Sequence, residues 1–166
     1  MNEDDIFDQT EGAYLCLIHP VLRDDTYRLE IAPVVALAPS MPDELVASLI
    51  TGASWRERLL GICLAMANHP ASFIEPMLQS LRDPRGISII PACAALAVLT
   101  RRGKFAMTQT FAEMFDRQVF DGEIGWATDK AMHFAGLRAD DVPGRGPHCG
   151  QIFGDHIQVY SWIHAS

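Results

Sequence analysis

The chain has 166 residues, of which 49% are apolar, and this length and composition indicate one globular domain with a sizeable core. Its net charge of −8, with basic residues scattered except at Arg101-Arg102, argues against binding to nucleic acid or to an anionic membrane. The acidic start without an apolar segment predicts no signal peptide and a cytoplasmic protein. The four cysteines show no disulfide pattern, which is consistent with that location.

The first 38 residues differ from the rest of the chain. Residues 1–12 are acidic and contain no basic residue, so we expect a partly disordered N-terminus. Residues 13–38 contain two apolar runs separated by Asp24-Asp25, and periodicity does not decide between helices and short strands. We favour helices, because an open stack of helical repeats must cover its terminal apolar face.

The segment from Met41 to His69 predicts a helical hairpin. Asp43 and Glu44 suit the positive end of a first helix, which Gly52 closes. Ser54 and Glu57 have the spacing of a capping box that would begin a second helix. The apolar stripe of that helix consists of Leu59, Ile62, Cys63 and Met66.

The segment from Phe73 to Gly103 predicts a second hairpin. Ser72 and Glu75 again have the capping-box spacing, Asp83-Pro84 breaks the first helix, and Gly86 lets the chain reverse. From Ile89 to Leu99 every residue except Pro91 has an apolar side chain. A helix that is apolar all round is buried on all sides, and this one is too short to span a bilayer, which needs about 20 residues.

The segment from Lys104 to Leu137 predicts a third hairpin, followed by a capping segment at residues 138–166. Its first helix would bury Phe105, Phe111 and Phe115, Asp121-Gly122 would turn the chain, and Gly136 would end the second helix. Residues 138–150 have the proline and glycine content of a loop. The final run, residues 151–166, suits either β structure or a short helix on the last repeat.

Residues 41–137 resemble HEAT-type helical repeats. The match is carried by an LxxLxD pattern and the Ala- and Leu-rich helix after it, namely Leu78, Leu81, Asp83, Ile87, Ile90, Ala94, Ala95, Leu96 and Leu99. The resemblance implies an all-α fold of three stacked antiparallel hairpins with capping segments at both ends. The layout is also similar to small bacterial HEAT-like proteins with SWRxRL and WAxxxA motifs, here residues 54–59 and 126–131. Some proteins of that kind neutralise a toxin made by the same cell.

Candidate catalytic or metal-binding residues are confined to the C-terminal segment. His148, Cys149, His156 and His164 have metal-ligand side chains, but their spacing matches no CxxC or HxxxH pattern. Cys149 beside His148 is a possible nucleophile and base, although sequence neighbours rarely present their side chains to each other. We therefore predict no catalysis, no metal and no cofactor.

A stripe on the last repeat helix predicts a partner-binding face. Trp126, Asp129 and His133 lie at i, i+3 and i+7, opposite the apolar stripe of the same helix. The tryptophan is either packed under the C-terminal segment or held out as an interface anchor. Packing is the commoner of the two arrangements, but we assign the partner-binding face on the second, with Glu123, Trp55 and Glu57 extending it.

Three functions remain open from the sequence. The first is a binding module, most simply an acidic immunity-type protein that occludes a toxin with a basic surface. The second is a metal-dependent enzyme that uses the C-terminal His/Cys segment. The third is a scaffold subunit of a larger assembly.

Overall fold

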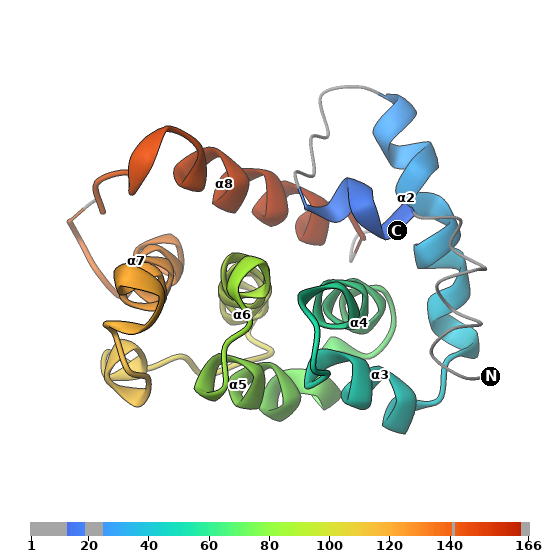
Figure 1. Ribbon diagram of the computed structural model, residues 1–166, viewed down its shortest axis with the longest axis horizontal. Helices are drawn as coiled ribbons and strands as arrows, with labels where there is room; N and C mark the ends of the chain where they lie inside the picture. The colour runs from blue at the N-terminus through green and yellow to red at the C-terminus, as the bar shows by residue number, and fades with distance from the viewer. Residues whose placement is uncertain (1–12, 19–24, 141, 164–166) are drawn as a thin grey trace.

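The computed structural model describes residues 13–18, 25–140 and 142–163, and every regular element in these ranges is helical (Figure 1), which confirms the all-α prediction. The α-helices are α2 (Asp25–Leu37), α3 (Asp43–Ile50), α4 (Trp55–Ala67), α5 (Ile74–Arg82), α6 (Ile89–Arg101), α7 (Val119–Phe134) and α8 (Gly146–Ile163). The 3-10 turns are η1 (Ala13–Leu17), η2 (Ala38–Ser40), η3 (Pro70–Phe73), η4 (Gly86–Ser88) and η5 (Phe111–Met114). None of the described helices is long and apolar enough to cross a bilayer.

The helices form three layers. In Figure 1, α4, α6 and α7 lie side by side in the middle layer, with α3, α5 and η5 on one side and α8 crossing the other. α8 packs on α6 and α4, and α2 packs on α4 at one end of the stack. The middle layer is therefore covered on both faces by elements of the same chain.

Helix α6 is the centre of the core. Every residue from Ile89 to Leu99 is buried, as the sequence predicts. Helices α4, α5, α7 and α8 all contact α6, and its alanines let these neighbours approach closely. A helix with four neighbours has no solvent-facing side, which explains why it carries no polar stripe.

The first two predicted hairpins are present as α3–α4 and α5–α6. The capping box of α4 forms as predicted, since Glu57 N–H donates to Ser54 Oγ (3.3 Å) and Ser54 N–H donates to Glu57 Oε2 (3.1 Å). The predicted cap of α5 is wrong, because no side chain caps that helix. Instead η3, which begins at Pro70, runs directly into α5, so the chain is already turned when the helix begins.

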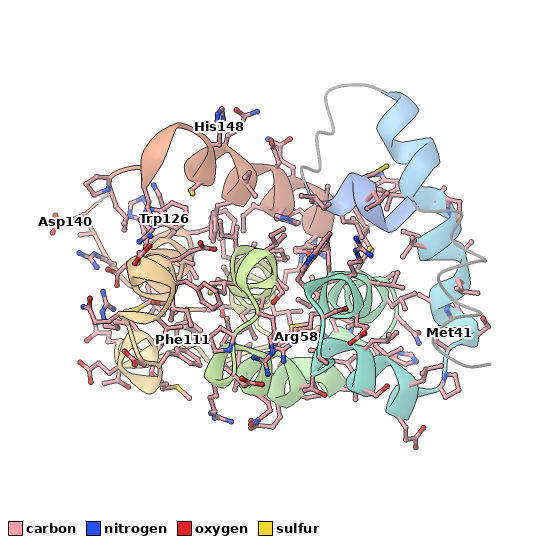
Figure 2. The ribbon with its side chains drawn as sticks, in the orientation of Figure 1. Met41, Arg58, Phe111, Trp126, Asp140 and His148 are labelled. Atoms are coloured by element: carbon pink, nitrogen blue, oxygen red, sulfur yellow. The ribbon has the colours of Figure 1, made fainter. Side chains whose placement is uncertain are left out.

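A buried arginine joins these two hairpins. Arg58 of α4 is 1% exposed, and its guanidinium lies between α3 and α5 (Figure 2). It donates to the carbonyl oxygens of Gly52 (2.7 Å), Ser80 (3.0 Å) and Asp83 at the C-terminal ends of those helices. A cation is favoured at this end of a helix, where carbonyl groups lack intrahelical partners. Arg58 therefore fixes how the second hairpin stacks on the first.

The third predicted hairpin is wrong in its first half. Residues 104–118 contain only the short turn η5 in place of a helix. Phe111 packs edge-to-face on both Phe105 and Phe115, with ring centroids 6.2 and 5.3 Å apart. These three rings fill the space beside α7 that a helix would otherwise fill, so no further helical turn is needed to bury them. The second half is correct, because α7 is present and ends before Gly136, whose φ is +79°.

The segments outside the predicted repeats are also helical in their described parts. Residues 25–37 form α2, in agreement with our preference for helices there. At the other end, the described part of residues 151–166 is helical and not β structure, and the helix α8 is longer than expected. It begins at Gly146, inside the predicted loop.

Candidate functional site

Trp126 is buried, which corrects the prediction that it is an exposed anchor. Its side chain is 8% exposed and lies between α7 and α8 (Figure 2). The indole Nε1 donates to the carbonyl oxygen of Pro143 (2.8 Å), and the ring packs edge-to-face on Phe153 of α8 (centroids 6.3 Å apart). Because α8 covers this side of the middle layer, the stripe that would face a partner faces the chain itself.

Asp129 and His133 hold neighbouring loops in place. Both carboxylate oxygens of Asp129 accept hydrogen bonds from Arg117 (2.8 and 3.1 Å), and Arg138 lies 2.9 Å from one of them. Burial raises the pKa of Asp129, but the hydrogen bonds and charges of Arg117 and Arg138 outweigh it and hold the pKa below its usual value. His133 Nδ1 lies 3.2 Å from the Arg138 carbonyl oxygen. The geometry of these residues is that of a structural ion-pair cluster.

Trp55 and Glu57 do not join the stripe on α7. They lie at the start of α4, and α6 lies between α4 and α7 (Figure 1). Trp55 packs on the core, with the Arg56 guanidinium 5.3 Å from its ring centre, and Glu57 is used in the capping box. The predicted face therefore does not extend from α7 to Trp55 and Glu57.

The C-terminal histidines and cysteine do not converge. His148 is exposed and points away from the helical layers (Figure 2). His156 is fully buried and stacks on Tyr160, with ring centroids 5.4 Å apart. His164 lies outside the described residues. Within the described part of the chain, no group of three or more His, Cys, Asp and Glu side chains is placed to hold a metal ion.

A pocket of about 340 Å³ lies where η1, η4, α6, α7 and α8 meet. We call it the isoleucine pocket, because its walls are Ile18, Ile87, Ile90 and Ile152, with Gly86 between them. Glu123 and Cys149 add the polar lining. An apolar pocket with one or two polar groups is the usual form of a binding site for a small molecule or a single side chain.

A left-handed turn lies beside this pocket. Phe120, Asp121 and Gly122 have φ values of +51°, +52° and +84°, so the predicted turn at Asp121-Gly122 is confirmed and begins one residue earlier. Arg145 holds this turn by donating to the carbonyl oxygens of Phe120 (3.1 Å) and Asp121. A residue with a side chain loses roughly 1–2 kcal/mol in this conformation. The chain therefore has two consecutive residues in a costly conformation at this point.

The left-handed turn holds an aromatic side chain in solvent. Phe120 is 47% exposed, and its ring lies 3.9 Å from the position that a β-carbon on Gly86 would take. Ile87, a wall of the isoleucine pocket, is 44% exposed. Two large apolar side chains are thus exposed, one lining the pocket and one beside Gly86 of its lining. No sequence pattern marks a phenylalanine placed before Asp-Gly as exposed, so Phe120 is absent from the predicted site residues.

Glu123 begins the right-handed part of α7 and lines the isoleucine pocket. Burial raises its pKa, and the positive charge of Arg145 opposes that shift. Burial raises the pKa of Cys93 on α6, and the negative charge of Glu123 raises it further. Of the six predicted partner-binding residues, Glu123 is the one that lines this pocket.

A scan of the chain against protein-family models, a search of curated proteins and a search of solved structures found no match. The candidate site therefore depends on the geometry of its own residues.

Proposed function

We propose that this chain is a non-catalytic protein-binding module of the cytoplasm, and that it acts as an immunity-type protein that binds and occludes a cognate bacterial toxin. The observation that carries the proposal is Phe120, an aromatic side chain held 47% exposed by a left-handed backbone beside Gly86, which lines the isoleucine pocket. Strain of this kind costs stability, and it is found where a function requires the geometry.

The architecture supports a binding role. Helices α3 to α6 alternate between two layers in chain order, which suits a short HEAT-like stack whose third repeat has lost its first helix. In such a stack the inner helices α4, α6 and α7 would line the partner-binding face, but α8 covers that side here. We therefore move the proposed contact surface to Phe120, Ile87 and the isoleucine pocket.

Charge supports a basic partner. Acidic and basic residues nearly balance among the described side chains, whereas residues 1–12 carry acidic residues alone. The net charge of −8 therefore comes largely from segments outside the described side chains. Such a charge speeds association with a basic surface and contributes less to the final affinity.

The test is binding to the toxin encoded beside the gene of this protein. We expect the purified chain to bind that toxin domain in calorimetry and to restore growth of cells that express it. Phe120→Ala should weaken binding by about 2 kcal/mol, which is typical of an aromatic anchor. Met114→Ala is the matched control, because Met114 is 45% exposed on η5, outside the residues that line the pocket, and its loss should leave affinity unchanged.

One outcome would overturn the immunity function, and a second would overturn only the proposed contact surface. If the wild-type chain neither binds the neighbouring toxin at micromolar concentration nor protects cells from it, the immunity function is wrong. If Phe120→Ala and Met114→Ala bind as tightly as wild type, the function stands and the contact surface is elsewhere.

A further inference from the structure

The carboxylate of Glu123 differs from the other partly buried carboxylate of α7. Asp129 is neutralised by Arg117 and Arg138, whereas no described side chain forms a hydrogen bond or ion pair with Glu123. Burial nevertheless raises the pKa of Glu123. A carboxylate that is partly removed from water is stabilised by a hydrogen-bond donor, and a ligand that enters the pocket can supply one.

Arg145, the cation nearest in charge effect, is not the hydrogen-bond donor of Glu123. Arg145 lowers the pKa of Glu123 through its charge, but its guanidinium donates to the carbonyl oxygens of Phe120 and Asp121. Those hydrogen bonds hold the left-handed turn. Arg145 thus shapes the rim of the isoleucine pocket, while Glu123 keeps its acceptor oxygens for a donor that enters the pocket.

The rest of the pocket suits a flexible apolar stem that ends in a planar cation. Ile87, Ile90 and Ile152 would pack against methylene groups. Phe120 at the rim presents an aromatic ring, on which a guanidinium stacks better than an ammonium because it is planar and less strongly hydrated. The volume of about 340 Å³ is near the lower end of ligand pockets, roughly 300–1,000 Å³, and suits one side chain.

We propose that the isoleucine pocket binds an alkyl-guanidinium group, the side chain of an arginine that the partner presents. Glu123 accepts its hydrogen bonds, the isoleucines contact its methylene groups, and Phe120 covers it at the rim. This inference rests on the proposed function for the source of the arginine, but the chemistry of the pocket can be tested without any partner.

The probe pair is N-acetyl-arginine methylamide and N-acetyl-citrulline methylamide, which have nearly the same shape and differ in charge. Binding is followed by the ¹H–¹⁵N NMR shifts of Gly86, Ile87 and Cys149 in the full chain. We expect the arginine compound to shift these signals with an affinity at least about tenfold higher than citrulline, because a hydrogen bond between charged groups is stronger than one to a neutral donor.

The matched variants are Glu123→Gln and Glu113→Gln. Glu113 is an exposed carboxylate on η5 and does not line the pocket. Glu123→Gln should bring the two compounds to the same weak affinity, whereas Glu113→Gln should keep the tenfold preference. Thermal unfolding of both variants checks that the fold is unchanged.

Three results would overturn the inference: equal affinity of the two compounds for wild type, shifts that map outside the pocket, or a preference for arginine that survives Glu123→Gln. Its failure is distinguishable from failure of the proposed function. A chain that binds the arginine compound through Glu123 but no toxin keeps this inference and loses the immunity function. A chain that binds the toxin but prefers neither compound keeps the function and loses this inference.

Discussion

The two halves of α7 use the same kinds of side chain in opposite ways. Each half has an aromatic residue followed three positions later by a carboxylate, Phe120 with Glu123 and Trp126 with Asp129. Trp126 is 8% exposed and hydrogen-bonded, and Asp129 lies between two arginines. Phe120 is 47% exposed on a left-handed backbone, and Glu123 lines a pocket.

This comparison separates residues that stabilise the fold from residues that weaken it. Trp126 and Asp129 satisfy their polar groups and bury their apolar surface, as a stable core requires. By contrast, Phe120 leaves apolar surface exposed on a left-handed backbone, and Glu123 is a partly buried carboxylate. Both features lower stability in the absence of a ligand. Substitutions at the two pairs should therefore change the free energy of unfolding in opposite directions.

The largest effect is expected at Trp126. Trp126→Ala removes a buried ring, its contact with Phe153 and the hydrogen bond to Pro143, so we expect a loss of about 3–5 kcal/mol in the free energy of unfolding. Urea denaturation measures it, and Phe120→Ala is the comparison. A loss below about 1 kcal/mol would mean that the packing of α8 does not depend on the contact between Trp126 and Phe153.

The second effect concerns the ion-pair cluster. Asp129→Asn should cost about 1.5 kcal/mol at pH 7, because it removes charged hydrogen bonds from Arg117 and Arg138. The folded pKa of Asp129 is below 3.8, so its stabilisation is present above that pH and is lost as the pH falls through the folded pKa. The difference between variant and wild type in urea should therefore shrink in acid. A pH-independent difference would contradict the ion-pair assignment.

The third effect tests backbone strain at Phe120. Alanine normally stabilises a helix more than glycine does, but a left-handed position favours glycine. We expect Phe120→Gly to be about 1 kcal/mol more stable than Phe120→Ala, since both remove the ring and only glycine relieves the strain. At Gln151, exposed on α8, the order should be reversed. The same order at both positions would show that the turn at Phe120 is not left-handed in solution.

The smallest effect is expected at Glu123. Its folded pKa is raised above 4.5, so its contribution to stability is fully present below that pH and is lost as the pH rises through the folded pKa. Glu123→Gln should therefore be about 0.5 kcal/mol more stable than wild type at pH 7, and this gain should vanish below pH 4.5. Thermal unfolding across this range measures it. A variant that is less stable at pH 7 would show that Glu123 has a stabilising partner.

Local patterns predicted several helix ends, turns and buried runs correctly. The capping pair Ser54 and Glu57, the turn at Gly86 and the apolar run from Ile89 to Leu99 all have their predicted roles. Each depends on residues within a few positions of one another, so the sequence contains the information directly. The missing helix at residues 104–118 is a case where packing of three phenylalanines overrode a helical pattern.

The candidate site was largely beyond such patterns. Of the predicted face, Glu123 lines the pocket, whereas Trp126 and Asp129 are packed inside the molecule. Helical spacing placed these residues on one stripe correctly, but it could not show which stripe α8 would cover. The residues that line the isoleucine pocket, Glu123 included, come from four parts of the chain, which no local pattern relates.

The sequence by itself determined the all-α class, the two regular hairpins and the complete burial of α6, because hydrophobic periodicity and turn residues act over a few positions. Only the tertiary structure decided which aromatic residue of α7 is buried and which is exposed. That outcome depends on where α8, far along the chain, packs across the middle layer and on how Arg145 holds the left-handed turn. Contacts between distant segments are set by the sum of all packing, and no single stretch of sequence contains them.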